Sequence, residues 1–152
     1  MLTLTRLVFS ALDEKKLQPV VGQRAVCSQL HRVGTAVDLV CYKQDTSSLV
    51  LVELKCGYSG CKTAAARDAS GECYMKGPLR RAADHTLHRH MAQLALTHAM
   101  FMREKHTLKR LGSLGLESVD GLLLYANDAV VESYELAAWW RRKAAATLDF
   151  AR

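Results

Sequence analysis

The chain has 152 residues, a mass of 16.9 kDa and a formal net charge of +6, with a pI near 9.2. This length fits one core, so we expect a single domain over residues 1–152. Hydrophobic residues make up 49% and charged residues 24%, which disfavours a disordered chain, and no apolar run reaches the roughly 20 residues that cross a bilayer. The basic charge favours a polyanionic partner such as nucleic acid, and no membrane is expected as a partner.

The opening segment predicts a helix that ends before Pro19. Its apolar residues recur at helical spacing, namely Leu4, Leu7, Val8 and Leu12, and a charged cluster follows them. Residues 20–33 come next and alternate imperfectly. They predict the first of three antiparallel strands, with Ala25, Cys27, Gln29 and His31 on one face.

Residues 36–42 and 49–55 are strand-like runs on either side of a polar turn, and together they predict a β-hairpin. Side chains two apart on a strand share a face, so Glu53 and Lys55 are expected to point the same way. Asp38 on the partner strand would lie opposite them. Two carboxylates and an ammonium in this arrangement suit a hard cation with a bound water.

Asp38 and Glu53 are both flanked by apolar residues, so each interrupts a run that otherwise reads as buried. Burying a carboxylate without a partner or a metal is costly, which favours a functional site. The alternative is that Glu53 and Lys55 form the solvated face of an edge strand and that Asp38 is ordinary polarity near a turn.

Asp38, the turn, and Glu53-Leu54-Lys55 followed by Cys-Gly resemble the core of the PD-(D/E)XK nuclease superfamily, in particular its RecB and lambda-exonuclease type. The resemblance implies an α/β fold with a restriction-endonuclease-like αβββαβ core, in which a central mixed sheet is flanked by helices. It implies that Asp38 and Glu53 bind Mg²⁺ or Mn²⁺ and that the Leu54 carbonyl is a possible third ligand. Lys55 would orient the attacking water. One departure is Val37, which stands where the family pattern has Pro.

The resemblance also suggests two further residues near the metal. An acidic residue on the first helix often helps to hold the metal in this superfamily, which makes Glu14 a candidate. Some relatives place a His upstream of the Asp, which makes His31 another. The ordinary interpretations are a solvated charge at a helix end for Glu14 and a strand histidine near the surface for His31.

Residues 57–81 predict a long loop that is rich in Gly and in basic residues. Such a loop beyond Lys55 could close over a phosphate backbone, although solvated loop chemistry explains it equally well. The chain has five cysteines, Cys27, Cys41, Cys56, Cys61 and Cys73. Their odd number and the lack of a clear signal peptide predict reduced thiols and an intracellular protein of unknown compartment. The last three lack a Cys-x-x-Cys spacing, so a zinc or cluster site is the lesser alternative.

Residues 84–109 predict one helix with a core stripe of Leu87, Met91, Leu94, His98, Phe101 and Met102. Off this stripe lies Gln93, which resembles the Gln that faces the active site in RecB-type nucleases. The Tyr that often follows four residues later is Thr97 here. His85, His88, Arg89 and His90 lie nearby, and we interpret them as a basic face rather than as a zinc site.

The rest of the chain predicts a loop over 112–121, a buried strand over 121–126 and a last helix over 132–146, whose Trp139 and Trp140 are interpreted as core packing. Taken together, the sequence predicts a Mg²⁺- or Mn²⁺-dependent nuclease that hydrolyses phosphodiester bonds, in DNA more than in RNA. The proposed catalytic set is Asp38, Glu53, Lys55 and Gln93. The alternative is a nuclease-like domain that binds nucleic acid or a ribonucleoprotein without cutting it. A protein partner or a homo-oligomer fits the small size of the chain.

Overall fold

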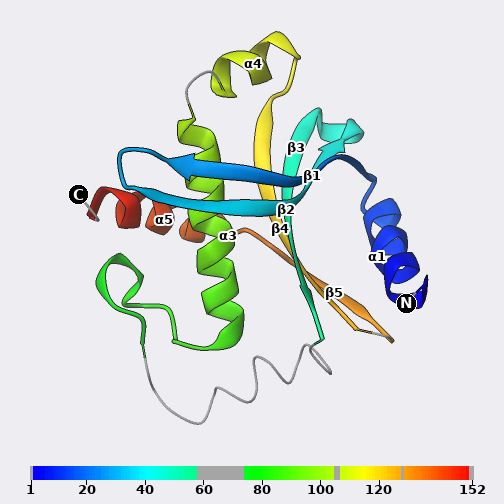
Figure 1. The fold of residues 1–152 in the computed structure, drawn as a ribbon, viewed down its shortest axis with the longest axis horizontal. Coiled ribbons are helices and arrows are strands. Elements are labelled where there is room, and N and C mark those ends of the chain that lie inside the picture. Colours follow the sequence, from blue (N-terminus) through cyan, green and yellow to red (C-terminus); the bar gives the residue numbers. More distant parts are fainter. Residues whose placement is uncertain (1, 58–73, 105–106, 128, 151–152) are drawn as a thin grey trace.

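The computed structural model describes residues 2–57, 74–104, 107–127 and 129–150 (Figure 1). Its helices are α1 (Leu2–Glu14), α3 (Thr86–Arg103), α4 (Thr107–Ser113) and α5 (Ala138–Phe150), with short 3-10 segments η1 (Gln44–Thr46) and η2 (Gly77–Leu79). Its strands are β1 (Leu17–Ser28), β2 (Val33–Lys43), β3 (Ser48–Cys56), β4 (Ser118–Ala126) and β5 (Val131–Glu135). The described part of the chain is therefore an α/β structure.

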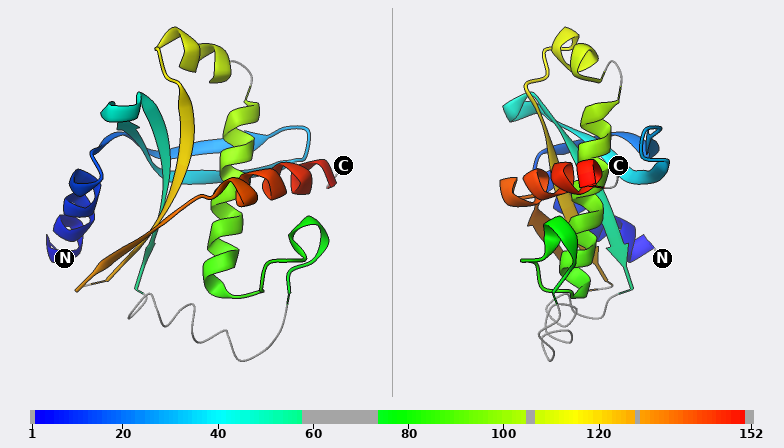
Figure 2. Two further views of the ribbon diagram at one scale, coloured as in Figure 1. Left: turned by 180° about the vertical axis from the view of Figure 1, so that it is seen from behind. Right: turned by 90° about the vertical axis from the view of Figure 1, so that its left-hand side faces the viewer.

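The strands form one five-stranded sheet in the order β1-β2-β3-β4-β5. The sheet is mixed, because β3 and β4 are parallel while the other neighbours are antiparallel. A parallel pair needs a crossover connection, which here contains α3 and α4. Figures 1 and 2 show β1 and β2 crossing α3, while β3 and β4 run between α3 and α1.

Alternation along β3 and β4 divides the core between the two faces of the sheet. Leu51 and Leu123 belong to a large cluster with residues of α3 and α5. Val52 and Leu122 face the other way and pack with Val8 of α1 in a smaller cluster. Glu53 lies two residues after Leu51, so its side chain points toward α3, where most of the core lies.

Gly121 lets α3 and the chain after β5 come very close to β4. A Cβ atom at this position would lie 2.9 Å from two side-chain atoms of Leu136 and 3.4 Å from Leu94 of α3. Since real Cβ atoms essentially never approach other atoms to less than 3.0 Å, the close packing depends on glycine here. This packing fixes the height of α3 above the sheet and therefore the reach of its side chains.

Strand β2 loses its pairing with both neighbours at Asp38. Its pairing with β3 ends at Leu39 and Val52, one step before Asp38 would meet Glu53. Its pairing with β1 passes over Asp38 and the residue opposite, Gln23, which has a left-handed φ of +49°. Asp38 therefore lies where the sheet opens between β2 and β3.

The side-chain alternation of β2 changes at the same point. Val37 and Val40 both belong to the core cluster on the α3 side, although residues three apart on a regular strand face opposite sides. The chain is thus turned between them, around Asp38. Before this point, from Val33 to Val37, β2 pairs with β1 and not with β3, and the two strands form a ribbon that packs on α3 (Figure 1).

Several boundaries predicted from the sequence are wrong. Residues 20–33 are not one strand, because β1 begins at Leu17, ends at Ser28, and is followed by a turn with Arg32 at φ +52°. Pro19 lies inside β1, which it can do because β1 is the edge of the sheet and a register shift follows it.

The prediction for the second half of the chain needs larger corrections. The helix over 84–109 is two helices, because Glu104 has an extended ψ of 132° that ends α3. Residues 118–120, predicted as loop, belong to β4, and residues 132–135, predicted as the start of a helix, belong to β5. Strand β5 was missed because its short, half-exposed sequence mixes charged and aromatic residues, as an amphipathic helix does.

The remaining elements are confirmed: the first helix, the hairpin of β2 and β3, the buried strand over 121–126 and the core stripe of α3. Trp140 is buried at the start of α5, as expected for core packing. Within the described residues, none of the helices has the length and apolar character needed to cross a bilayer.

Candidate active site and metal centre

Glu53 is the centre of the candidate site. Its residue is only 3% exposed, because β3 places it under α3 in line with the core residue Leu51. One carboxylate oxygen, Oε1, accepts hydrogen bonds from Lys55 and Gln93. The other, Oε2, is buried and has no hydrogen-bond partner in the structure. A buried ionised oxygen without a partner is costly, so this atom calls for a ligand.

Lys55 and Gln93 close a three-membered network on Glu53. Nζ of Lys55 donates to Oε1 of Glu53 at 2.6 Å and to Oε1 of Gln93 at 3.2 Å, while Nε2 of Gln93 donates to Oε1 of Glu53 at 2.7 Å. Both Lys55 contacts are charge-assisted, and the three bonds hold each group in one orientation. The structure thus brings together three of the four residues predicted as catalytic.

Asp38 is held beside this network by the backbone of β3. Its Oδ2 accepts a hydrogen bond of 2.8 Å from the Leu54 amide, which takes the place of the lost strand pairing. The N–H and C=O of one strand residue face the same neighbouring strand, so the Leu54 carbonyl also faces the opening on the β2 side. Asp38, Glu53 and the Leu54 carbonyl therefore border one gap in the sheet.

The electrostatics of Glu53 agree with this geometry. Its pKa is raised above the ordinary value, mainly because burial removes water from the charged form and also because Asp38 lies close by. The ammonium of Lys55 and the Gln93 hydrogen bond oppose this effect and do not cancel it. The site thus holds the negative charge of Glu53 at a net cost.

These residues fit a hard divalent cation. Mg²⁺ and Mn²⁺ take oxygen ligands, and Mg²⁺ usually binds through one or two carboxylates, together with waters and substrate phosphates. Asp38 and Glu53 supply two carboxylates, and Oε2 of Glu53 is an oxygen that nothing else engages. No set of three His, Cys, Asp or Glu side chains comes together anywhere in the described residues, so the donor set does not match a zinc site.

Two other residues predicted near the metal lie elsewhere. Glu14 lines a cavity of about 590 Å³ with Val50 and Asp120, near the beginnings of β3 and β4 rather than the end that carries Glu53. His31 lies in the turn between β1 and β2, where its Nδ1 is 2.6 Å from the Ser28 hydroxyl. Glu14 therefore agrees with its ordinary interpretation as a solvated charge at a helix end, and His31 lies in a turn rather than on a strand, so the alternative role of each near the metal is not supported.

The residues of α3 that the sequence analysis grouped around Gln93 have different surroundings in the structure. His85 is the N-cap residue, and its Nδ1 accepts a hydrogen bond from the His88 amide at 3.3 Å. Arg89 points to solvent and pairs with Asp84 at 2.7 Å. Thr97, in the place of the family Tyr, donates to the carbonyl of Gln93 at 2.9 Å and stays within its own helix. Gln93 is the member of this group that contacts Glu53.

Sequence reasoning missed a pair at the edge of the network, His90 and Tyr125. Nδ1 of His90 and the Tyr125 hydroxyl lie 2.6 Å apart. His90 precedes Gln93 by one helical turn, and Tyr125 is the residue of β4 opposite Lys55. The helical spacing from Gln93 was a signal that could have identified His90, whereas the contact with Tyr125 required the strand register.

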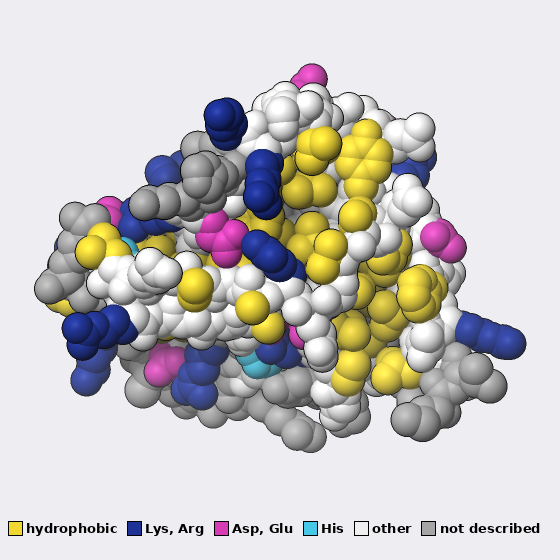
Figure 3. All heavy atoms as spheres, turned by 45° about the horizontal axis from the view of Figure 1, so that its top comes forward, with side chains coloured by type: hydrophobic (Ala, Val, Ile, Leu, Met, Phe, Trp, Pro, Cys, Tyr) yellow, Lys and Arg dark blue, Asp and Glu magenta, His cyan; other side chains and the backbone are white. Residues whose placement is uncertain are grey.

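Most of the predicted loop lies outside the described residues, including Lys62 and Arg67. Cys61 and Cys73, two of the three cysteines considered for a zinc or cluster site, also lie outside them. In the described part of the chain Cys27, Cys41 and Cys56 are free thiols. The sequence predicts both Cys27 and Cys41 as buried strand residues; Cys41 is buried, whereas Cys27 is exposed. Arg80 and Arg81 are exposed on the segment before α3. Figure 3 shows Lys and Arg side chains next to a broad apolar area on one face of the molecule.

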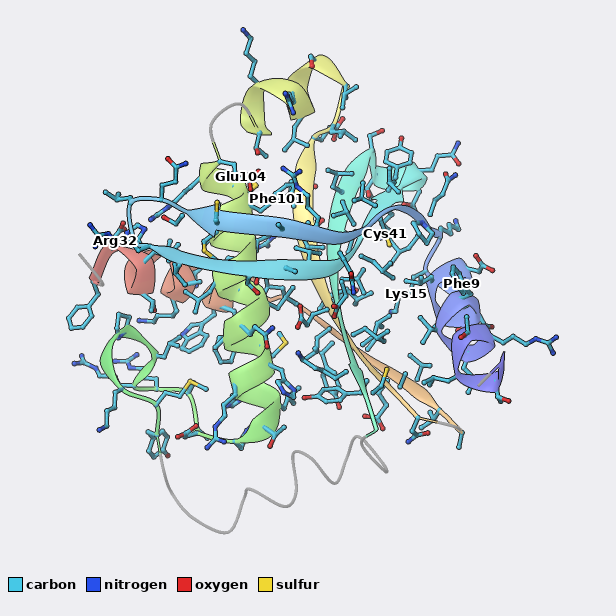
Figure 4. All side chains as sticks on the ribbon, in the orientation of Figure 1. Phe9, Lys15, Arg32, Cys41, Phe101 and Glu104 are labelled. Carbon is cyan, nitrogen blue, oxygen red and sulfur yellow. The ribbon has the colours of Figure 1, made fainter. Side chains whose placement is uncertain are left out.

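The ribbon of β1 and β2 is anchored over α3 at some distance from the network. Arg24 of β1 pairs with Glu104 at the end of α3 at 3.2 Å. Figure 4 shows Glu104 and Phe101 at that end of α3 beside the ribbon, and Arg32 at the tip of the ribbon. These contacts hold the ribbon, and with it the start of β2, against the helix that carries Gln93.

Comparison with known proteins adds no relative: no family model matches this sequence, and no curated protein matches it.

Proposed function

We propose that this protein is a divalent-metal-dependent nuclease of the PD-(D/E)XK type, with a restriction-endonuclease-like core, that hydrolyses phosphodiester bonds in DNA. The observation that carries the proposal is the buried Oε2 of Glu53, which has no partner although it lies beside Lys55 and Asp38. A purely structural carboxylate would be expected to have all its hydrogen bonds made. The resemblance of the Asp38 and Glu53-Leu54-Lys55 pattern to the nuclease family supports the same function.

In the proposed reaction, Asp38, Glu53 and the Leu54 carbonyl would hold Mg²⁺ or Mn²⁺. When bound, such an ion lowers the pKa of its water and offsets charge on the phosphoryl group. Lys55 donates hydrogen bonds, so it can orient the attacking water and stabilise the negative charge that grows on the phosphoryl oxygens. Gln93 is hydrogen-bonded to both Lys55 and Glu53, and it keeps the ammonium and the carboxylate in fixed positions while substrate binds.

The net charge of +6 supports a nucleic-acid substrate, because Lys and Arg that contact phosphates release counterions. Exposed basic residues in the described segment before α3, Lys76, Arg80 and Arg81, precede the helix that carries Gln93. They lie on a short turn closed by the bridge of Tyr74 with Ala83. We propose that these three side chains contact the phosphate backbone of the substrate.

The test is a titration of Mn²⁺ by calorimetry into the wild type, Glu53→Gln and the matched control Glu135→Gln, whose carboxylate is exposed on β5. Each protein is then incubated with linear and circular DNA and with RNA. We expect the wild type and the control to bind Mn²⁺ and cleave DNA, and Glu53→Gln to do neither. Nucleic-acid binding without cleavage by the wild type, unaffected by chelator, would establish the non-cutting binding domain instead.

A further inference from the structure

His90 and Tyr125 are neighbours of the residues that hold Lys55. Lys55 bonds Gln93 of α3, and His90 precedes Gln93 by one turn of the same helix. Tyr125 is the partner of Lys55 in the parallel pairing of β3 with β4, and it is 1% exposed. One helix and one strand thus carry a histidine and a tyrosine next to the residues that hold the ammonium.

The histidine is held rigidly in this place. Its Nδ1 and the Tyr125 hydroxyl are 2.6 Å apart, and the two rings lie at 5.7 Å between centroids. Tyr125 is itself fixed by an edge contact with the Tyr134 ring, whose hydroxyl donates to Glu132 at 2.8 Å. A side chain fixed by a hydrogen bond and by packing can impose a direction on its neighbour.

Building on the proposed nuclease function, we propose that His90 is a positioning residue of this site. Its uncharged imidazole, held by Tyr125, forms the wall opposite Glu53 and keeps the Lys55 ammonium directed at Glu53 and Gln93. Lys55 thereby donates toward the place where water and the scissile phosphate meet. A protonated His90 would put a second cation beside Lys55 and push the ammonium out of this arrangement.

The charges around His90 favour the uncharged form. Its pKa is lowered below the ordinary value, first by burial and then by the charge of Lys55 on β3. The Tyr125 hydroxyl of β4 lies 2.6 Å from its Nδ1, and the Lys55 ammonium is paired with Glu53. From β5, Glu132 is engaged by the Tyr134 hydroxyl. His90 therefore stays neutral near pH 7 and takes a proton only in more acidic solution.

The kinetic test compares three proteins with saturating Mn²⁺ on the linear DNA that the wild type cleaves best. His90→Asn keeps a hydrogen-bonding atom near the position of Nδ1 and cannot titrate, whereas His90→Leu loses the bond to Tyr125. We expect His90→Leu to lower kcat by about tenfold to a hundredfold with KM within about twofold, and His90→Asn to recover most of the loss. The fall of kcat in acid should be shallower in His90→Asn than in the wild type.

A second measurement stands independently of activity. The imidazole of His90 is titrated by NMR in the metal-free wild type, in Lys55→Met and in Tyr125→Phe. Lys55→Met should raise the pKa of His90, because it removes a cation that opposes protonation, and Tyr125→Phe should shift the Nδ1 resonance.

These two experiments separate the inference from the proposed function. If the wild type cleaves no nucleic acid, the nuclease proposal fails, and the NMR titration still decides whether His90 and Lys55 are coupled. The positioning role is overturned if His90 titrates identically in Lys55→Met and the wild type. It is also overturned if His90→Leu cleaves with the kcat and pH profile of the wild type.

Discussion

Two polar side chains are buried between α3 and the sheet, and they differ in whether their hydrogen bonds are complete. His98 lies on α3 and donates from Nε2 to the Val119 carbonyl of β4 at 2.9 Å. Glu53 lies on β3, and its Oε2 has no partner. Both residues are less than 9% exposed, so burial alone does not distinguish them. The unmet hydrogen bond does, because Oε2 of Glu53 is buried without a partner in the structure, whereas Nε2 of His98 is bonded to the Val119 carbonyl.

The backbone around the two groups differs in the same way. Next to His98, β4 stays paired with β3 along its whole length, from Ser118 to Ala126. Next to Glu53, β2 leaves both of its neighbours at Asp38, and an amide that would bond to a strand bonds to a carboxylate instead. Irregular backbone that is fixed by a side chain commonly marks functional positions.

The largest expected effect is on catalysis at the Glu53 end. Lys55→Met removes the donor that contacts Glu53 and Gln93, and we expect kcat/KM for DNA cleavage to fall by about a hundredfold to a thousandfold. Lys43→Met, at the other end of the sheet, is the matched control and should stay within about twofold of the wild type. Equal activity of the two variants in a gel or fluorescence assay would remove Lys55 from the mechanism.

The next effect is on stability at the His98 end. His98→Ala leaves the Val119 carbonyl buried without its donor and opens a cavity, so we expect the free energy of unfolding to fall by about 2–3 kcal/mol. Urea titration measures this loss. The contrast between His98 and Glu53 would be contradicted if His98→Ala were as stable as the wild type, or if its remaining folded fraction had lost cleavage activity.

A smaller effect of opposite sign is expected for Glu53→Gln. The raised pKa of Glu53 means that its surroundings disfavour the charge, so a neutral amide should raise the metal-free unfolding free energy. Saturating Mn²⁺ should then stabilise the wild type and leave Glu53→Gln unchanged, because a ligand stabilises only the state that binds it. Thermal unfolding with and without Mn²⁺ measures both differences. A variant that melts below the metal-free wild type would show that Glu53 is a structural anchor.

The sequence predicted the Glu53 end better than the rest of the site. Period-two spacing placed Glu53 and Lys55 on one face, and the apolar neighbours of Asp38 indicated that it was partly buried. Three residues of the predicted set, Glu53, Lys55 and Gln93, contact one another, whereas Asp38 is held beside them by the Leu54 amide rather than as a regular cross-strand neighbour. No pattern in the sequence indicated that β2 would turn at Asp38, since this depends on pairing with β1.

The rest could not be predicted because it depends on contacts distant in the sequence. His90 and Tyr125 meet only after β4 has paired with β3. Strand β5 is stable as an edge strand because β4 is already present, and its own five residues carry little signal. Glu14 and His31 were candidates by analogy alone, and the turns next to them place both away from Glu53.

The smallest expected effect is a pH dependence of stability from His98. Its pKa is lowered from the ordinary value of 6.5, first by burial and then by the charge of Arg141, while the Val119 bond and Asp120 oppose this. Above pH 6.5 the imidazole is neutral in both the folded and the unfolded chain, and its contribution to stability is complete. As the pH falls below 6.5 the unfolded chain takes up the proton first, so stability decreases until the pH reaches the lowered pKa of the folded state.

Urea unfolding between pH 7.5 and 5 separates this contribution from those of the other histidines. His88 and His90 also have lowered pKa values, so the three histidines together should lower the stability of the wild type in acid, while the raised pKa of Glu53 acts in the opposite direction. His98→Gln keeps an amide that can donate to the Val119 carbonyl and removes one titrating group, so its decline should be shallower. The matched variant His88→Gln should also have a shallower decline and should keep the part due to His98. If His98→Gln loses stability in acid as steeply as the wild type, the imidazole at position 98 is not held neutral by its burial, and the contrast with Glu53 would have to rest on hydrogen bonding alone.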